Sequence, residues 1–120
     1  MRILLCDDSM TVRKKLSQQI KDVCECDIIE AKNGQAAVDA YTAHRPSLVL
    51  MDIMMPVKDG LTALREIMAY DPSAKVIMLS SVGTKDNLQK ALKSGAIDFM
   101  QKPFEKERLV KLFSDFQEEV

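Results

Sequence analysis

The chain alternates between short apolar runs and longer segments in which apolar residues recur every three or four positions. Continuous apolar runs of about five residues are typical of strands buried on both faces, whereas the three-to-four spacing is typical of helices that bury one face. The pattern predicts five strand–helix pairs in succession. The predicted strands span residues 2–6, 27–31, 47–51, 75–79 and 97–101, and the predicted helices begin near residues 9–10, 35, 60, 85 and 105.

The first predicted helix shows the pattern clearly, since one apolar stripe follows from the positions of Val12, Leu16, Ile20 and Val23. Arg13, Lys14 and Lys15 lie off this stripe, so we expect them on a solvated face. In the fourth helix, Thr84 is placed to cap the first turn and Gly95 follows the last one.

Strict alternation of strands and helices implies a parallel sheet with helices on both faces and right-handed crossovers. Eight such pairs would close a barrel, but five form an open sheet. We therefore predict a single domain over residues 1–120 with a doubly wound, flavodoxin-like α/β fold: a five-stranded parallel sheet of order 2-1-3-4-5 and five helices.

The composition is that of a globular domain, with 47% hydrophobic and 29% charged residues in 120. The net charge of −1 leaves no basic footprint, so we expect no direct nucleic acid binding. No apolar run approaches the roughly 20 residues that a membrane span needs. The apolar part of the N-terminus is too short for a signal peptide, and we expect a cytoplasmic protein.

The three cysteines are an odd number, which argues against a disulfide framework in a reducing compartment. Cys24 and Cys26 are separated by one residue instead of the two usual in thiolate metal sites, and His44 is the only histidine. Inert, buried or half-buried thiols are the favoured interpretation.

Candidate chemistry appears where the predicted strands end. Asp7 and Asp8 follow the first strand, Asp52 the third, Ser80 the fourth and Lys102 the fifth. Because the carboxyl ends of parallel strands lie on one edge of the sheet, we expect these side chains to meet in one crevice at the switch point. Each alone would suit a helix cap, a turn or a solvated surface, but their joint occurrence in strand order favours a functional site.

Three carboxylates in one crevice repel one another. At about 4 Å each pair costs roughly 1 kcal/mol in water and about 4 kcal/mol at an effective dielectric constant of 20. A bound cation offsets this cost, and oxygen ligands without histidine or cysteine favour Mg2+. Such a site suits phosphoryl transfer, with Lys102 and Ser80 on the phosphoryl oxygens and Asp52 as the nucleophile that becomes an aspartyl phosphate.

With these residues the chain resembles, over its whole length, the receiver domain of bacterial two-component response regulators. The pattern from Ser80 to Phe99 is most similar to that of the chemotaxis receivers, which bind the flagellar motor switch. The segments that carry the resemblance are Asp7-Asp8, Asp52-Ile53-Met54-Met55-Pro56-Val57-Lys58-Asp59-Gly60, Ser80 and Lys102-Pro103-Phe104.

The resemblance implies a set of roles for these residues. Asp52 would be phosphorylated by a histidine kinase. Mg2+ would be held by Asp8, Asp52 and the backbone carbonyl of Met54, with Asp7 assisting through water. Ser80 and Lys102 would bind the phosphoryl group.

The resemblance also implies how phosphorylation is read out. The Ser80 hydroxyl would move toward the phosphoryl group and Phe99 would rotate inward, which remodels the partner-binding face made by the fourth helix, fifth strand and fifth helix. The Lys102–Pro103 peptide bond is expected to be cis, a form that costs little only before proline.

Two positions depart from the commonest pattern of the family. Met54 and Val82 lie two residues beyond Asp52 and Ser80, where polar side chains would orient the water that hydrolyses the aspartyl phosphate. Because both are apolar, we predict slow self-dephosphorylation and a possible need for a phosphatase partner.

Three alternatives stay open at this point. One is a receiver fragment of a larger DNA-binding transcriptional regulator. Another is a phosphatase of the haloacid dehalogenase type with Asp7 as nucleophile, although the second acid required there is replaced by Ser9. The last is a constitutive binding module with a vestigial site, against which the complete set of acids, hydroxyl and lysine argues.

Overall fold

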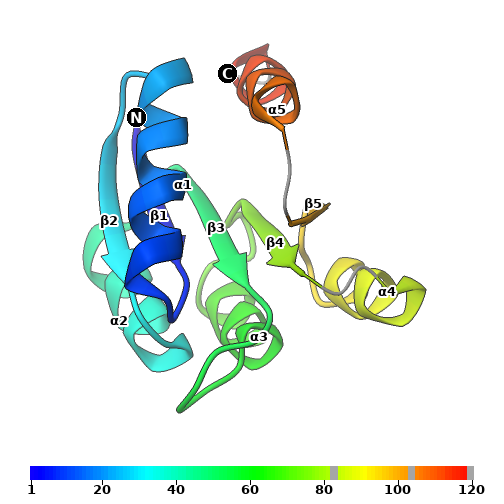
Figure 1. The fold of residues 1–120 in the computed structure, drawn as a ribbon. Helices are drawn as coiled ribbons and strands as arrows, with labels where there is room; N and C mark the ends of the chain where they lie inside the picture. Colours follow the sequence, from blue (N-terminus) through cyan, green and yellow to red (C-terminus); the bar gives the residue numbers. More distant parts are fainter. Residues whose placement is uncertain (82–83, 103–104, 119–120) are drawn as a thin grey trace.

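The computed structural model describes residues 1–81, 84–102 and 105–118, and within them five strands alternate with five helices (Figure 1). The elements are β1 (Arg2–Cys6), α1 (Met10–Val23), β2 (Asp27–Ala31), α2 (Gly34–His44), β3 (Leu48–Asp52), α3 (Gly60–Tyr70), β4 (Val76–Ser80), α4 (Lys85–Lys93), β5 (Asp98–Gln101) and α5 (Lys106–Glu118).

The strands form one parallel sheet of order β2-β1-β3-β4-β5, which confirms the predicted doubly wound fold. The observed bounds differ from the predicted ones by about one residue. The small shift matters at two places, since Asp52 is the last residue of β3 and Ser80 is the last residue of β4. Both are therefore held by the backbone ladder of the sheet and are not in mobile turns.

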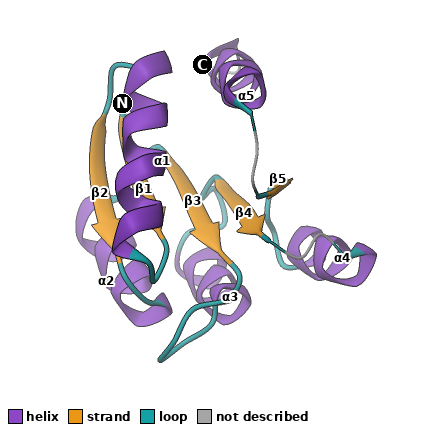
Figure 2. Ribbon diagram, in the orientation of Figure 1, coloured by secondary structure: helices purple, strands orange, loops and turns teal. Residues whose placement is uncertain are grey.

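The sheet separates two apolar cores, and β3 contributes side chains to both. Val49 and Met51 belong to the core beneath α2 and α3, whereas Leu48 and Leu50 belong to the core beneath α1 and α5. Figure 2 shows the two helix pairs on opposite faces of the strands. Successive side chains of a strand point to opposite faces, so a central strand covered on both sides must be apolar throughout.

Four helices begin with a polar side chain that caps the first turn. The caps are Ser9, Asn33, Asp59 and Thr84, and each accepts a hydrogen bond from the backbone N–H three residues later. These bonds fix the loops at the same edge of the sheet as the strand ends. Helix α1 has 14 residues, and α5 has 13 within the described part of the chain. Within the described ranges no helix has the length and apolar character needed to cross a membrane.

The cysteines are unpaired thiols, as the sequence indicates. Cys6 lies in the core beneath α2 and α3, and Cys24 in the core beneath α1 and α5. Burial, together with the charge of Asp7, raises the pKa of Cys6, and burial likewise raises the pKa of Cys26 to about 11. Thiols held in their protonated form are poor nucleophiles and poor metal ligands.

Candidate functional site

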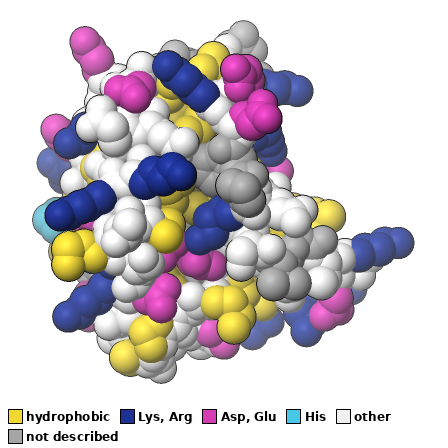
Figure 3. All heavy atoms as spheres, viewed as in Figure 1, with side chains coloured by type: hydrophobic (Ala, Val, Ile, Leu, Met, Phe, Trp, Pro, Cys, Tyr) yellow, Lys and Arg dark blue, Asp and Glu magenta, His cyan; other side chains and the backbone are white. Residues whose placement is uncertain are grey.

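The predicted site residues gather at the carboxyl edge of the sheet, as the strand directions in Figure 1 require. Asp7 directly follows β1, Asp52 ends β3, Ser80 ends β4 and Lys102 directly follows β5. On the face drawn in Figure 3, acidic and basic side chains lie next to one another in the lower middle, where the strands end. The side chains of Asp7, Asp8, Asp52 and Lys102 meet there, whereas the Ser80 side chain is buried and does not line the pocket.

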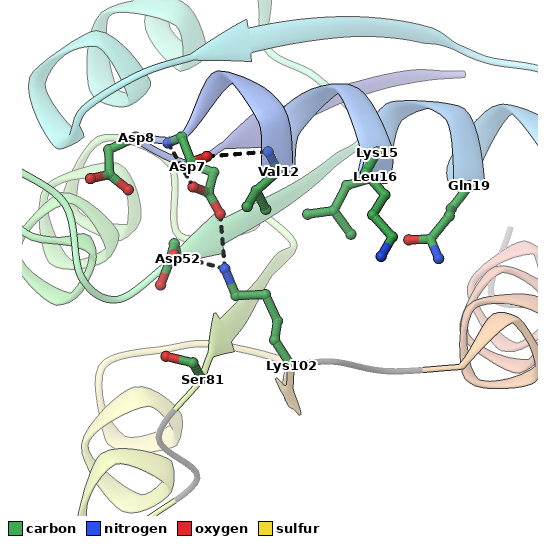
Figure 4. A pocket seen from close by; sticks show the side chains of 10 residues that line it. Asp7, Asp8, Val12, Lys15, Leu16, Gln19, Asp52, Ser81 and Lys102 are labelled. Carbon is green, nitrogen blue, oxygen red and sulfur yellow. Dashed lines mark hydrogen bonds and ion pairs between the residues drawn. The ribbon is translucent and has the colours of Figure 1, made fainter.

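Lys102 lies between two of the acids and bonds to both (Figure 4). Its Nζ is 2.8 Å from Asp7 Oδ2 and 2.9 Å from Asp52 Oδ2. The three side chains are 17%, 2% and 11% exposed, respectively. Ion pairs this well shielded from water are not weakened by solvent as surface pairs are, so the ammonium fixes the spacing of the two carboxylates.

Hydrogen bonds fix the backbone N–H, the backbone carbonyl and the carboxylate of Asp7. Its N–H donates to the Ala31 carbonyl at 3.1 Å, and its Oδ1 accepts from the Ser9 N–H at 2.9 Å. Its own carbonyl accepts a bond of 2.6 Å from the Arg13 guanidinium, which also contacts Glu30. Each of these contacts restricts the backbone or the carboxylate, so the position of Asp7 is defined without a ligand.

The contact of Arg13 corrects the expectation that this residue lies on a solvated face. Its side chain is only 14% exposed and joins α1 to the ends of β1 and β2. Helical periodicity shows which way a residue leaves the helix, but it carries no information about what a long side chain reaches. No signal in the sequence pattern alone would have found it.

The two buried acids have opposite pKa shifts although they share one cation. Burial raises the pKa of Asp52, and the Lys102 ammonium and the Met54 N–H offset this only in part. Burial also disfavours the charge of Asp7, but its hydrogen bonds from Lys102 and Ser9 outweigh that effect and lower its pKa. The carboxylates in turn raise the pKa of Lys102 despite its burial. Asp7 is thus the stable anion of the pair, and Asp52 the one whose charge is costly.

Asp8 completes an acidic cluster at the mouth of the site. Carboxylate oxygens of Asp7, Asp8 and Asp52 lie within 4.8 Å of one another, and Asp8 is exposed. Figure 4 shows Asp8 beside the other two acids and apart from Lys102. Oxygen ligands of this charge and spacing fit a small hard divalent cation, so these three acids could bind a metal.

A pocket of about 450 Å³ opens over the cluster and continues along α1. Ser81 lines this pocket, together with Ser9 at the start of α1, whereas Ser80 is 1% exposed and is not among the lining residues. Ser80 is tied to the site through its carbonyl, which accepts the Lys102 N–H at 2.7 Å. The two neighbouring serines thus occupy different settings, which sequence reasoning did not distinguish.

The remaining predicted residues lie at the margin of the site or outside the described ranges. Phe99 on β5 is half-buried and packs against the core beneath α2 and α3. The Met54 side chain is 69% exposed, while its N–H donates to Asp52 Oδ1 at 3.2 Å. Val82 and the Lys102–Pro103 peptide bond, with the tuning and cis-peptide predictions made for them, fall outside the described residues.

The fold and the strand-end cluster of acids with one lysine define a doubly wound α/β domain with a candidate metal site, and sequence comparison identifies its family. The response regulator receiver domain matches residues 3–114, and the chain belongs to this family. It is 43% identical to a chemotaxis protein CheY of Listeria monocytogenes over 92% of this chain and 93% of that protein. It is 40% identical to the chemotaxis protein CheY of Halobacterium salinarum over 95% and 94%.

Solved structures agree with this assignment. The CheY chain in the CheX-CheY-BeF3-Mg+2 complex from Borrelia burgdorferi has a TM-score of 0.88 at 32% identity, covering 97% of this chain and 89% of that one. The receiver domain of the NarL response regulator from Mycobacterium tuberculosis has a TM-score of 0.88 at 26% identity, covering 95% and 93%. Membership of the receiver family disfavours the dehalogenase-type phosphatase.

Proposed function

We propose that this receiver domain, spanning residues 1–120, is a phosphorylation-activated signalling module of a two-component phosphorelay. Asp52 takes a phosphoryl group from the phosphohistidine of a histidine kinase, with Mg2+ as cofactor. The observation that carries the proposal is the Lys102 ammonium held 2.8 Å from Asp7 and 2.9 Å from Asp52, beside a third acid at the mouth of the pocket.

The donor set suits Mg2+. Asp8, Asp52 and the Met54 backbone carbonyl would be its protein ligands, and Asp7 would act through a water molecule. The bound ion supplies positive charge close to the phosphoryl oxygens. Lys102 favours the ionised forms of Asp7 and Asp52, although burial still raises the pKa of Asp52, and it holds both carboxylates in place beforehand.

In the transfer step, a carboxylate oxygen of Asp52 attacks phosphorus and forms a new O–P bond while the N–P bond to the kinase histidine breaks. The electron pair of the broken bond stays on the imidazole nitrogen. An ammonium has three N–H donors, and Lys102 donates two of them to Asp7 and Asp52. The third is available for a phosphoryl oxygen, and the Ser80 hydroxyl would bind another.

The output would pass through α4, β5 and α5. Ser80 moves toward the new phosphoryl group and Phe99 follows into the space that is vacated. Leu88, Leu92 and Ile97 already expose apolar surface on α4 and before β5, as a protein-binding face requires. Chemotaxis and control of the flagellar motor are the favoured setting because several similar proteins are chemotaxis proteins CheY.

Labelling with acetyl phosphate and Mg2+ tests the proposal. We expect about one phosphoryl group per chain, loss of labelling in Asp52→Asn, and full labelling in Asp39→Asn, which removes an exposed acid on α2. Multiple turnover that survives Asp52→Asn would instead support a true phosphatase. No labelling of the parent protein would support a binding module with a vestigial site.

The partner is tested by comparing proteins retained by the beryllofluoride form with those retained by the apo form. Selective retention of a flagellar motor switch protein supports the chemotaxis role. Retention of a transcription complex would support the regulator alternative. A protein of either kind that Asp52→Asn no longer retains is a phosphorylation-dependent partner. A phosphatase would be recognised because it shortens the lifetime of the phosphoryl group.

A further inference from the structure

Arg13 makes two directed contacts at the acid site. Its Nη1 donates to the Asp7 backbone carbonyl at 2.6 Å, and its Nε donates to Glu30 Oε1 at 3.1 Å. It is a residue of the first turns of α1 and reaches past the helix start to the ends of β1 and β2. The planar guanidinium can hold two acceptors at a fixed angle, which a lysine ammonium cannot do in the same way.

These contacts hold the backbone of Asp7 on both sides of its Cα. The Asp7 N–H is bonded to the Ala31 carbonyl, and the Asp7 carbonyl is bonded to Arg13, which is anchored on Glu30 beside Ala31. Both ends of the Asp7 residue are thereby tied to the last two residues of β2. Asp8 comes next in the chain and has no strand partner to hold it, so its direction depends on how firmly Asp7 is held.

We propose that Arg13 is a positioning residue of the acid cluster: it holds the Asp7–Asp8 turn so that the carboxylates converge on one divalent cation. The inference rests on the proposed function, since it assigns Arg13 a part in the Mg2+ dependence of phosphorylation. Arg13 itself touches neither the cation nor the phosphoryl group.

The charge of Arg13 and its positioning role predict opposite changes in Mg2+ affinity when the residue is removed, which makes the inference testable. A positive charge near a cation site weakens cation binding, so removing it should tighten Mg2+ binding if charge were its only contribution. If Arg13 positions the acids, removing it loosens Mg2+ binding even though the site becomes more negative. Lys14, the next residue on α1, is exposed and has the same charge, and it serves as the matched control.

The experiment measures Mg2+ affinity by calorimetry on the full chain. We expect Arg13→Met to weaken binding roughly tenfold, the lower end of the range typical for partners of metal ligands. Lys14→Met should leave binding unchanged or slightly tighter. Arg13→Lys keeps the charge and should still lose most of the affinity. Glu30→Ala removes only the anchor and should give a smaller loss, and it tests the same idea if Arg13→Met does not fold.

A second readout needs no metal. Amide hydrogen exchange of Asp7 and Ser9 in the apo protein should accelerate in Arg13→Met and Glu30→Ala, because the turn opens locally, and should stay unchanged in Lys14→Met. Phosphorylation by acetyl phosphate should recover at saturating Mg2+. Unchanged exchange together with Mg2+ binding as tight as in the parent would overturn the inference, whereas a parent protein that binds no Mg2+ would overturn the proposed function instead.

Discussion

Burial destabilises the ionised form of Asp52. Its side chain is 11% exposed, and burial raises its pKa although Lys102 and the Met54 N–H both stabilise the anion. Asp7, with the same lysine and a firmer set of donors, has a lowered pKa. A nucleophile whose anion is destabilised in the resting protein gains more from a bound cation or a transferred phosphoryl group than a fully satisfied carboxylate would.

This cost predicts that Asp52→Asn stabilises the apo protein at neutral pH. The pKa of Asp52 is higher in the folded than in the unfolded state, so the folded protein favours the protonated carboxyl. This contribution to the free energy of unfolding is fully present below the unfolded-state pKa and is lost as the pH rises through the folded-state pKa. The amide does not ionise, so the melting temperature of the variant should exceed that of the parent near pH 7. The difference should shrink as the pH falls toward 4, and a parent that is more stable at pH 7 would contradict the argument.

The phosphoryl lifetime is expected to depend on Met54. Its exposed thioether offers a water molecule no strong hydrogen bond at the mouth of the site, and Val82 is also apolar. Introducing Met54→Asn together with Val82→Glu should shorten the half-life of phosphorylated Asp52, measured by loss of label after removal of the phosphodonor. A parent half-life no longer than that of the double variant would refute the prediction.

Among the elements, the loop from β3 to α3 is held by several specific contacts. The Gly60 N–H donates to the Ile53 carbonyl at 2.8 Å, and Val57 has a φ of 68°, an unusual value for a β-branched residue. The Lys58–Glu66 ion pair joins the loop to α3. Such a conformation persists only when its surroundings enforce it. The same loop begins with the Met54 N–H donating to Asp52 Oδ1 at 3.2 Å.

Gly60→Ala should disturb this loop and the site together. A Cβ at Gly60 would overlap the Asp52 backbone carbonyl, which cannot move without shifting the end of β3. We expect a loss of stability of about 2 kcal/mol, in the range for overpacked sites, and impaired labelling by acetyl phosphate per folded molecule.

Gly95→Ala is the matched comparison for this prediction. Gly95 has a φ of 110°, and the atoms nearest to a Cβ there belong to the flexible side chain of Met68. This variant should also be less stable, by about 1–3 kcal/mol from backbone strain, yet it should label normally because it lies away from the acids. Equal labelling of both variants, measured beside their denaturation curves, would show that the loop does not control the site.

At the scale of the whole molecule, the site joins parts of the chain that are far apart in sequence. Lys102 connects the end of β5 to Asp7 at β1 and Asp52 at β3, across sequence separations of 95 and 50 residues. The two cores on either face of the sheet hold these strands in register, so the acids are brought together by folding energy even though they repel one another.

Mg2+ should therefore stabilise the whole domain. A cation that binds only the folded state at a hundred times its Kd adds about 2.7 kcal/mol to the free energy of unfolding. Denaturation curves with and without Mg2+ at constant ionic strength should show this gain in the parent and its loss in Asp8→Asn. A gain that is equal in the variant, or reproduced by Na+, would assign the effect to general screening.

The sequence by itself determined the architecture and the chemical inventory of the site. Runs such as Leu48 to Met51 predict central parallel strands because only a strand covered on both faces is apolar throughout. Parallel strands share one edge for their carboxyl ends, so the positions of Asp7, Asp8, Asp52 and Lys102 at the ends of the first, third and fifth strands already predicted one crevice.

Only the tertiary structure decided how these groups act on one another. The reach of Arg13 to Asp7, the different settings of Ser80 and Ser81, and the opposite pKa shifts of Asp7 and Asp52 follow from contacts across the fold. Periodicity fixes the direction in which a side chain leaves its element, whereas burial and hydrogen-bond partners depend on neighbours that folding brings together. Those neighbours turn a row of strand-end acids into a site in which the anion of Asp7 is stabilised and the anion of Asp52 is destabilised.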